Sequence, residues 1–161
     1  MRIINGSLCL CIVLVSCGAA QEPVPSNWKK VNEHYFEFYV PPDMEKVMVQ
    51  GIDSHVGQYQ NKSITLNFDY GLYSDPLNYV SKQPQESVEI DGHQARIVRY
   101  KDADGRFIMA VHIPAILRER EYVGPKLTMF SSCASQTDFD TVREIYYSVR
   151  FLKYTEEAHK L

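Results

Sequence analysis

The residue types in this chain that are best suited to acid–base chemistry or metal binding are its histidines. The 161 residues contain five of them, at positions His34, His55, His93, His112 and His159. None belongs to an H-x-x-x-H or H-E-x-x-H pair, in which one helix would present two imidazoles to a metal ion. A metal site would have to be assembled across strands, and the sequence predicts neither a bound metal nor a cofactor.

His112 lies in an apolar segment, residues 107–113, that has the composition of a buried strand. Side chains alternate between the two faces of a strand, so His112 shares a face with Ala110 and lies opposite Met109 and Val111. We expect this imidazole to be hydrogen-bonded or to face solvent, and not to act as a metal ligand or a general base.

Asp53, Ser54 and His55 bring the three residue types of a hydrolase triad into one tripeptide. Contiguity argues against a triad, because folding and not adjacency brings the members of a triad together. The chain also lacks a G-x-S-x-G turn. We therefore expect a protein that is not an enzyme. The alternative is an enzyme whose cross-strand site includes His55 or His112.

Tyrosine is the unusual feature of the composition, with eleven residues. Its side chain combines a large contact area with a polar group and is enriched at interfaces, although it also suits half-buried strands. A charged run over residues 117–121 belongs to a loop between apolar segments, where binding residues often occur, although it also suits a solvated loop. We predict a binding surface made by Tyr70, Tyr73, Arg118, Arg120 and Tyr122.

The N-terminal segment ends in a cysteine that could carry a lipid. An apolar run over residues 8–15 is too short to span a bilayer and leads into Leu14-Val15-Ser16-Cys17. This segment resembles the leader and lipobox of bacterial lipoprotein precursors. The resemblance implies a signal peptide over residues 1–16, a lipid on Cys17 and anchoring to a membrane through that lipid. Gly18 in place of an aspartate favours the outer membrane, facing the periplasm.

The leader also has a second interpretation. Gly18-Ala19-Ala20 supplies the small residues of a conventional secretory cleavage site before Gln21. Cleavage there would give a secreted or periplasmic soluble protein. In the lipidated form Cys133 is the one cysteine left with a free thiol, and its apolar neighbours predict an inert thiol in the core.

Composition limits the remaining classes of function. The formal net charge is −3, and the chain lacks the clustered basic face that a nucleic-acid-binding protein needs. After a polar tether over residues 17–27, the length suits a single domain over residues 28–154, followed by a charged tail over residues 155–161.

Strand-like segments separated by turn residues dominate this domain. Ile64, Leu66, Phe68 and Tyr70 alternate with polar residues and predict one buried face of a strand. Asp91-Gly92 and Asp104-Gly105 predict hairpin turns, because glycine tolerates a positive φ. The strands that we expect cover residues 35–40, 47–53, 63–70, 87–90, 95–100, 107–113 and 126–133, and a short one covers 151–152.

One helix is expected near the C-terminus. Thr137 and Asp140 have the spacing of a capping box. The apolar residues that follow, Phe139, Val142, Ile145, Tyr146 and Val149, have helical spacing. A short helix or a loop is expected over residues 75–82. The chain therefore has the pattern of an α+β domain, in which helices pack on a mostly antiparallel sheet.

Three segments of this domain resemble the PsbP-like and DcrB-like proteins. They are Phe-Glu-Phe-Tyr-Val-Pro-Pro-Asp-Met at 36–44, Val-Glu-Ile-Asp-Gly-His-Gln-Ala at 88–95 and Ser-Val-Arg-Phe at 148–151. The resemblance implies an α/β/α sandwich and a non-catalytic accessory or binding role. It carries over no site residues.

Together these features predict a lipid-anchored binding or accessory protein of the bacterial cell envelope, which contacts another envelope or secreted protein. A cell-envelope enzyme and a carrier of a small ligand or lipid are the alternatives. A carrier would need an apolar cavity of about 300 Å³ or more between the sheet and the helices.

Overall fold

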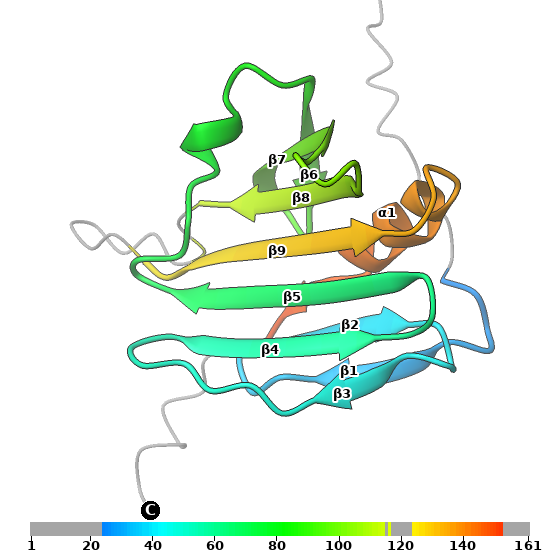
Figure 1. Ribbon diagram of the computed structural model, residues 1–161. Helices are drawn as coiled ribbons and strands as arrows, with labels where there is room; N and C mark the ends of the chain where they lie inside the picture. The colour runs from blue at the N-terminus through cyan, green and yellow to red at the C-terminus, as the bar shows by residue number, and fades with distance from the viewer. Residues whose placement is uncertain (1–23, 115, 117–123, 153–161) are drawn as a thin grey trace, which may run out of the picture.

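The computed structural model describes residues 24–114, 116 and 124–152. These residues form two antiparallel sheets (Figure 1). The larger sheet has seven strands, in the spatial order β3 (Glu45–Val47), β4 (His55–Gln60), β5 (Ile64–Gly71), β9 (Lys126–Cys133), β8 (Phe107–Ile113), β7 (His93–Lys101) and β6 (Gln85–Ile90). The smaller sheet has the order β1 (Lys29–Asn32), β2 (Phe36–Val40) and β10 (Arg150–Phe151).

Helix α1 (Asp138–Tyr147) and the smaller sheet lie on the same face of the larger sheet. The helix is held to the edge strand β6 by a two-pronged ion pair, in which Arg143 donates to both carboxylate oxygens of Glu86 at 2.8 and 2.5 Å. The expected mostly antiparallel α+β fold is confirmed. The helix expected near the C-terminus is present as α1, and the short helix or loop expected over residues 75–82 contains the 3-10 turn η1 (Asn78–Val80).

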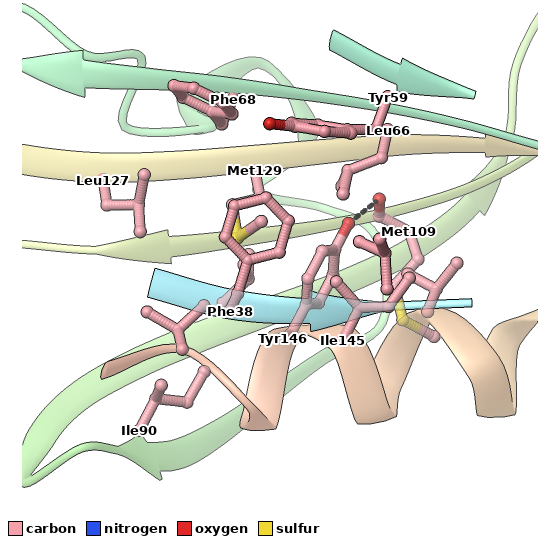
Figure 2. Packing of buried hydrophobic residues seen from close by; sticks show 14 of the residues in the cluster. Phe38, Tyr59, Leu66, Phe68, Ile90, Met109, Leu127, Met129, Ile145 and Tyr146 are labelled. Carbon is pink, nitrogen blue, oxygen red and sulfur yellow. Dashed lines mark hydrogen bonds between the residues drawn. The ribbon is translucent and has the colours of Figure 1, made fainter. Parts of the chain in front are cut away.

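The main core lies between the larger sheet and this layer (Figure 2). Tyr146 of α1 is fully buried, and its hydroxyl donates to the carbonyl oxygen of Met109 at 2.8 Å. The predicted helical face is confirmed, because Val142, Ile145 and Tyr146 are buried. A second, smaller core lies on the opposite face of the sheet, where the segment containing η1 covers Val98 and Ala110 with Leu77 and Val80. The helix α1 is not long and apolar enough to cross a membrane, and no other helix in the described residues is either.

Most predicted strands are confirmed, and those expected over residues 107–113 and 126–133 have the expected bounds. One prediction near the N-terminus is wrong, and two strands there were missed. Residues 48–53 are not a strand, because pairing with β4 ends at Val47. The missed strands are β1 and β4. The sequence of β4, His-Val-Gly-Gln-Tyr-Gln, buries only Gly57 and Tyr59 and so gives little apolar signal. Gly57 must be small, because a Cβ there would lie 2.2 Å from the ring of Phe68.

The helix cap begins two residues earlier than predicted. Asp138 accepts a hydrogen bond from the backbone N–H of Ser135 at 2.9 Å, and the Ser135 hydroxyl accepts one from the N–H of Thr137 at 3.2 Å. This resembles a capping box, except that the Ser135 hydroxyl bonds to the N–H two residues on and not three. Thr137 makes no side-chain cap. The predicted pair, Thr137 and Asp140, is therefore wrong, and the overlapping pair Ser135 and Asp138 makes the bonds instead.

The two ends of the larger sheet carry different turns and loops. At one end lie residues 25–28, which lead into β1, together with the turns 41–44, 61–63, 102–106 and 134–137. We call it the N-terminal end. At the opposite end, the distal end, lie the turn 33–35, the β3–β4 loop (residues 48–54) and residues 71–75. Figure 1 shows the distal end on the left and the N-terminal end on the right.

Candidate functional site

The most concentrated group of titratable residues in the described chain is built around Glu33. This residue begins the turn between β1 and β2, where its backbone N–H donates to the carbonyl oxygen of Phe36 at 2.9 Å and His34 adopts a positive φ of 62°. The turn points the carboxylate toward the edge of the larger sheet. Glu33 is only 3% exposed, so its charge requires partners.

Three side chains from β3 and β4 supply those partners. Lys46 Nζ lies 2.7 Å from Oε1, His55 Nε2 lies 3.1 Å from Oε2, and the Tyr59 hydroxyl donates to Oε1. An ionised carboxylate only accepts hydrogen bonds, so His55 Nε2 carries the proton. We call these four residues the Glu33 cluster. It ties the smaller sheet to the edge of the larger one.

The charges of the Glu33 cluster are balanced within it. Burial by itself would raise the pKa of Glu33, but the hydrogen bonds from Lys46 and Tyr59 and the neighbouring positive charges hold that pKa below its ordinary value. Burial, followed by the adjacent Glu33 carboxylate, raises the pKa of Tyr59 far above its ordinary value. Glu33 is thus an ionised group whose oxygens already accept from three donors, which leaves it poorly suited to remove a proton from a substrate.

A pocket of about 340 Å³ adjoins the cluster along β3, the β3–β4 loop and the start of β4. Its walls carry Lys46, Gln50, Ser54 and His55 beside four apolar side chains, Val47, Met48, Val49 and Val56. This is not the cavity that a carrier was expected to need, because it lies at the sheet edge and not between the sheet and the helix. It can receive a single side chain or a small molecule with both polar and apolar parts.

The tripeptide Asp53-Ser54-His55 does not form a triad. The hydrogen-bond partner of His55 in the described chain is Glu33, and neither Asp53 nor Ser54 bonds to the imidazole. One condition for an enzyme, a histidine near a carboxylate beside a pocket, is therefore met by His55. Ser54 also lines the pocket, but its hydroxyl makes no hydrogen bond to His55 in the described chain.

His112 belongs to a separate, closed polar group on the other face of the sheet. Its Nδ1 lies 2.8 Å from the Thr128 hydroxyl, which also contacts the Ser74 hydroxyl at 2.7 Å and the Asp75 carbonyl oxygen at 2.7 Å. Burial, then the positive charges of Arg96 and Lys126, lower the pKa of His112. The predicted hydrogen-bonded imidazole is confirmed. Ser74 and His112 are 1% and 6% exposed, so the group has no access for a substrate.

Two tyrosines of the predicted binding surface lie at the distal end and differ in their surroundings. The ring of Tyr70 stacks on Tyr35, with centroids 4.8 Å apart, and burial followed by Tyr35 raises the pKa of Tyr70 to about 12. Tyr73 is 81% exposed. The other predicted members, Arg118, Arg120 and Tyr122, lie outside the described residues. The surface as a whole therefore stays a prediction.

Two further observations concern the free thiol and the possible metal ligands. Cys133 is buried in the core, and burial followed by the nearby Asp138 raises the pKa of its thiol to about 12, which makes it unreactive. In the described ranges no three His, Cys, Asp or Glu side chains are grouped so that they could hold a metal ion.

A feature that the sequence did not predict lies beside the pocket. Met48 and Ile52 of the β3–β4 loop are 91% and 104% exposed, and Val49, Leu72 and Tyr73 are exposed as well. Residues 48–54 make no loop or turn backbone hydrogen bond and no side-chain hydrogen bond within the described chain. The run Met-Val-Gln-Gly-Ile-Asp-Ser could have indicated a loop, because Gly51 precedes Asp53 and Ser54.

Comparison with known proteins supports the fold. No protein-family model matches the chain, and no curated protein matches it. Among solved structures, the chain is similar to the solution structure of cyanobacterial PsbP (CyanoP) from Synechocystis sp. PCC 6803. The TM-score is 0.51 at 17% sequence identity, over 86% of this chain and 99% of the cyanobacterial one. The chain therefore has a PsbP-like α+β fold.

Proposed function

We propose that this protein is a lipid-anchored accessory protein of the bacterial cell envelope that binds another envelope protein through its distal end. The observation that carries the proposal is the arrangement of the two ends. The chain leaves Cys17 and joins the domain at the N-terminal end, where Lys29 pairs with Val40. The exposed apolar side chains of the β3–β4 loop lie at the opposite end.

This arrangement suits a protein that is held by its N-terminus and presents a surface away from the membrane. The tether over residues 17–27 spans at most about 36 to 40 Å when fully extended. It keeps the domain close to the lipid and leaves the distal end free for a partner. The lipobox Leu14-Val15-Ser16-Cys17 supports lipidation, and Gly18 favours the outer membrane.

A binding role is favoured over an enzymatic one by the state of the two histidine groups. The Glu33 carboxylate already accepts hydrogen bonds from Lys46, His55 and Tyr59. The His112 imidazole is enclosed, and burial lowers its pKa. Neither group pairs an available base with an accessible nucleophile. The PsbP-like fold of the cyanobacterial neighbour is compatible with an accessory role but does not specify a partner.

The anchor is tested by the mass and location of the mature protein. We expect a mature chain that begins at Cys17 and carries the added mass of its acyl groups, and that fractionates with the outer membrane. Cys17→Ser should remove that mass and release the protein from the membrane. Cys11→Ser, which changes a leader cysteine outside the lipobox, is the matched control and should change neither.

Two results would contradict this proposal. A mature chain that begins at Gln21 without added lipid would identify a conventional secretory protein. Membrane association that Cys17→Ser leaves unchanged would mean that another part of the chain holds the protein to the membrane.

A further inference from the structure

We propose that Met48 is a reversible oxidation site of this protein, at which a peroxide converts the thioether to a sulfoxide while the fold stays intact. The oxidant is a two-electron oxygen donor of the class of hydrogen peroxide. The inference goes beyond the proposed function, because it needs neither the lipid on Cys17 nor a partner protein.

Met48 differs from the other methionines of the domain in its exposure. Apart from Met1, the chain contains four methionines, all in the described residues: Met44, Met48, Met109 and Met129. Met48 is 91% exposed, whereas each of the other three is at most 1% exposed. An oxidant that diffuses in water therefore reaches the sulfur of Met48 in the folded protein, and it reaches the other sulfurs only when the surrounding structure opens.

The three buried methionines are held in the main core. Met44, Met109 and Met129 belong to the cluster between the larger sheet and the layer formed by α1 and the smaller sheet. The carbonyl oxygen of Met109 also accepts the hydrogen bond from the fully buried Tyr146. A sulfoxide at these positions would place a polar oxygen among apolar side chains, which disrupts a core. Their oxidation is therefore coupled to unfolding, and that of Met48 is not.

The loop that carries Met48 leaves its side chain open to water. Residues 48–54 make no loop or turn backbone hydrogen bond within the described chain. Met48 forms part of the wall of the pocket of about 340 Å³, which it shares with Lys46, Gln50 and Ser54. The side chains of these three residues carry hydrogen-bond donors. The oxygen of a sulfoxide on this wall is therefore in a setting that offers it water and donors.

The reaction transfers one oxygen atom and two electrons. A lone pair of the Met48 sulfur attacks one oxygen of hydrogen peroxide, the O–O bond breaks, and the second oxygen leaves as hydroxide. The hydroxide takes the proton from the transferred oxygen and becomes water. Sulfur is oxidised and the peroxide is reduced. The product is a polar side chain in place of an apolar one on the pocket wall, and methionine sulfoxide reductases convert it back.

The free thiol of the described chain does not compete for the oxidant. Cys133 is 2% exposed, and burial followed by the nearby Asp138 raises the pKa of its thiol to about 12. The thiolate is the form of cysteine that peroxide attacks. Cys133 therefore stays reduced under conditions that oxidise Met48.

Mass spectrometry of tryptic peptides tests the site on the mature protein as purified from cells. Trypsin cleaves after lysine and arginine, so Met48 lies in the peptide 47–62 and the other three methionines lie in the peptides 31–46, 107–118 and 127–143. After treatment with hydrogen peroxide, we expect the peptide 47–62 to gain about 16 Da, the mass of one oxygen atom, at least about tenfold faster than the other three. Equal rates in the folded protein would overturn the proposal.

Two controls show whether exposure of Met48 sets the rate. In urea that unfolds the protein, the four peptides should gain the oxygen at rates within about twofold of one another, because all four sulfurs are then exposed. Met48→Leu should abolish the fast gain of mass, whereas Met129→Leu, a volume-conserving change in the core, should leave it. A fast gain that persists in Met48→Leu, or a difference in rates that persists in urea, would overturn the proposal.

Two further measurements test the intact fold and the reversibility. The urea midpoint of the singly oxidised protein should equal that of the reduced protein, because the side chain of Met48 is exposed. The two classes of methionine sulfoxide reductase, each specific for one sulfoxide epimer, should together remove the added mass. A lowered midpoint or a mass that remains would overturn the proposal. None of these results bears on the proposed function, whose lipid is read from the mass of the N-terminal peptide.

Discussion

The turns at the N-terminal end of the larger sheet and the β3–β4 loop at its distal end are held in different ways. At the N-terminal end, side chains close the turns by bonding to the backbone. Asn61 Oδ1 accepts hydrogen bonds from the N–H groups of Ser63 and Ile64 at 3.0 and 2.8 Å, and Asp102 Oδ1 accepts from those of Asp104 and Arg106 at 3.0 and 2.9 Å. Ser135 and Asp138 close the start of α1 in the same way.

At the distal end the β3–β4 loop has no equivalent bonds. Other distal segments do have such bonds: Asn32 Oδ1 accepts from the N–H of His34 at 3.2 Å, and the Asp91 carboxylate accepts from the N–H of Phe151 at 2.7 Å. The Glu33 cluster fixes the edge of the larger sheet by linking it to the smaller sheet. The difference therefore lies in the β3–β4 loop, which is flanked by these fixed points but has no side-chain bond of its own within the described chain and exposes its apolar side chains.

Among variants that alter the two ends of the larger sheet, those that break the Glu33 cluster should have the largest effect on stability. Glu33→Gln removes the charge that Lys46 and His55 face and should lower the free energy of unfolding by about 2 kcal/mol. Both partners reach solvent, so the loss should stay below that of a fully buried ion pair. Urea unfolding measures it. Glu37→Gln, which loses the more exposed ion pair with Lys30, is the control and should cost less.

Glu33→Gln should also change how stability depends on pH. The folded protein holds the pKa of Glu33 below the ordinary value of 4.5. Its contribution is therefore present above about pH 4.5 and is lost as the pH falls through the lowered value, because the unfolded chain binds the proton first. The stability gap between the wild type and Glu33→Gln should therefore close progressively as the pH falls below about 4.5. A gap that stays constant would contradict the structural role of the ionised carboxylate.

At the N-terminal end, Asn61→Ala tests a locally closed turn. The variant leaves the N–H groups of Ser63 and Ile64 without their acceptor and should lower the free energy of unfolding by about 1 kcal/mol. Asn67→Ala is a matched control, because Asn67 makes no comparable bond to a turn. If Asn61→Ala costs as much as Glu33→Gln, the contrast between the two ends is wrong.

The same contrast explains what the sequence could predict. The turn at Asp102–Gly105 was found because Asp and Gly act on the backbone next to them. The strand β8 was found because its apolar residues are nearly continuous. The strand β4 was missed because its burial depends on Phe68 lying over Gly57, which no local pattern records. The Glu33 cluster was missed for the same reason. Glu33 and His55 are 22 positions apart in the sequence, and they meet because the β1–β2 turn points the Glu33 carboxylate toward β4.

The smallest effect on stability should come from the exposed β3–β4 loop. Ile52→Ser replaces a side chain that is 104% exposed, so the free energy of unfolding should change by less than about 0.5 kcal/mol. The matched core variant Ile64→Ser, on a residue that is 2% exposed, should lose several-fold more stability. Urea unfolding of the two variants checks both. If Ile52→Ser destabilises the fold, Ile52 contributes to its packing, and the exposed loop would be part of the structure itself and not a surface kept for a partner.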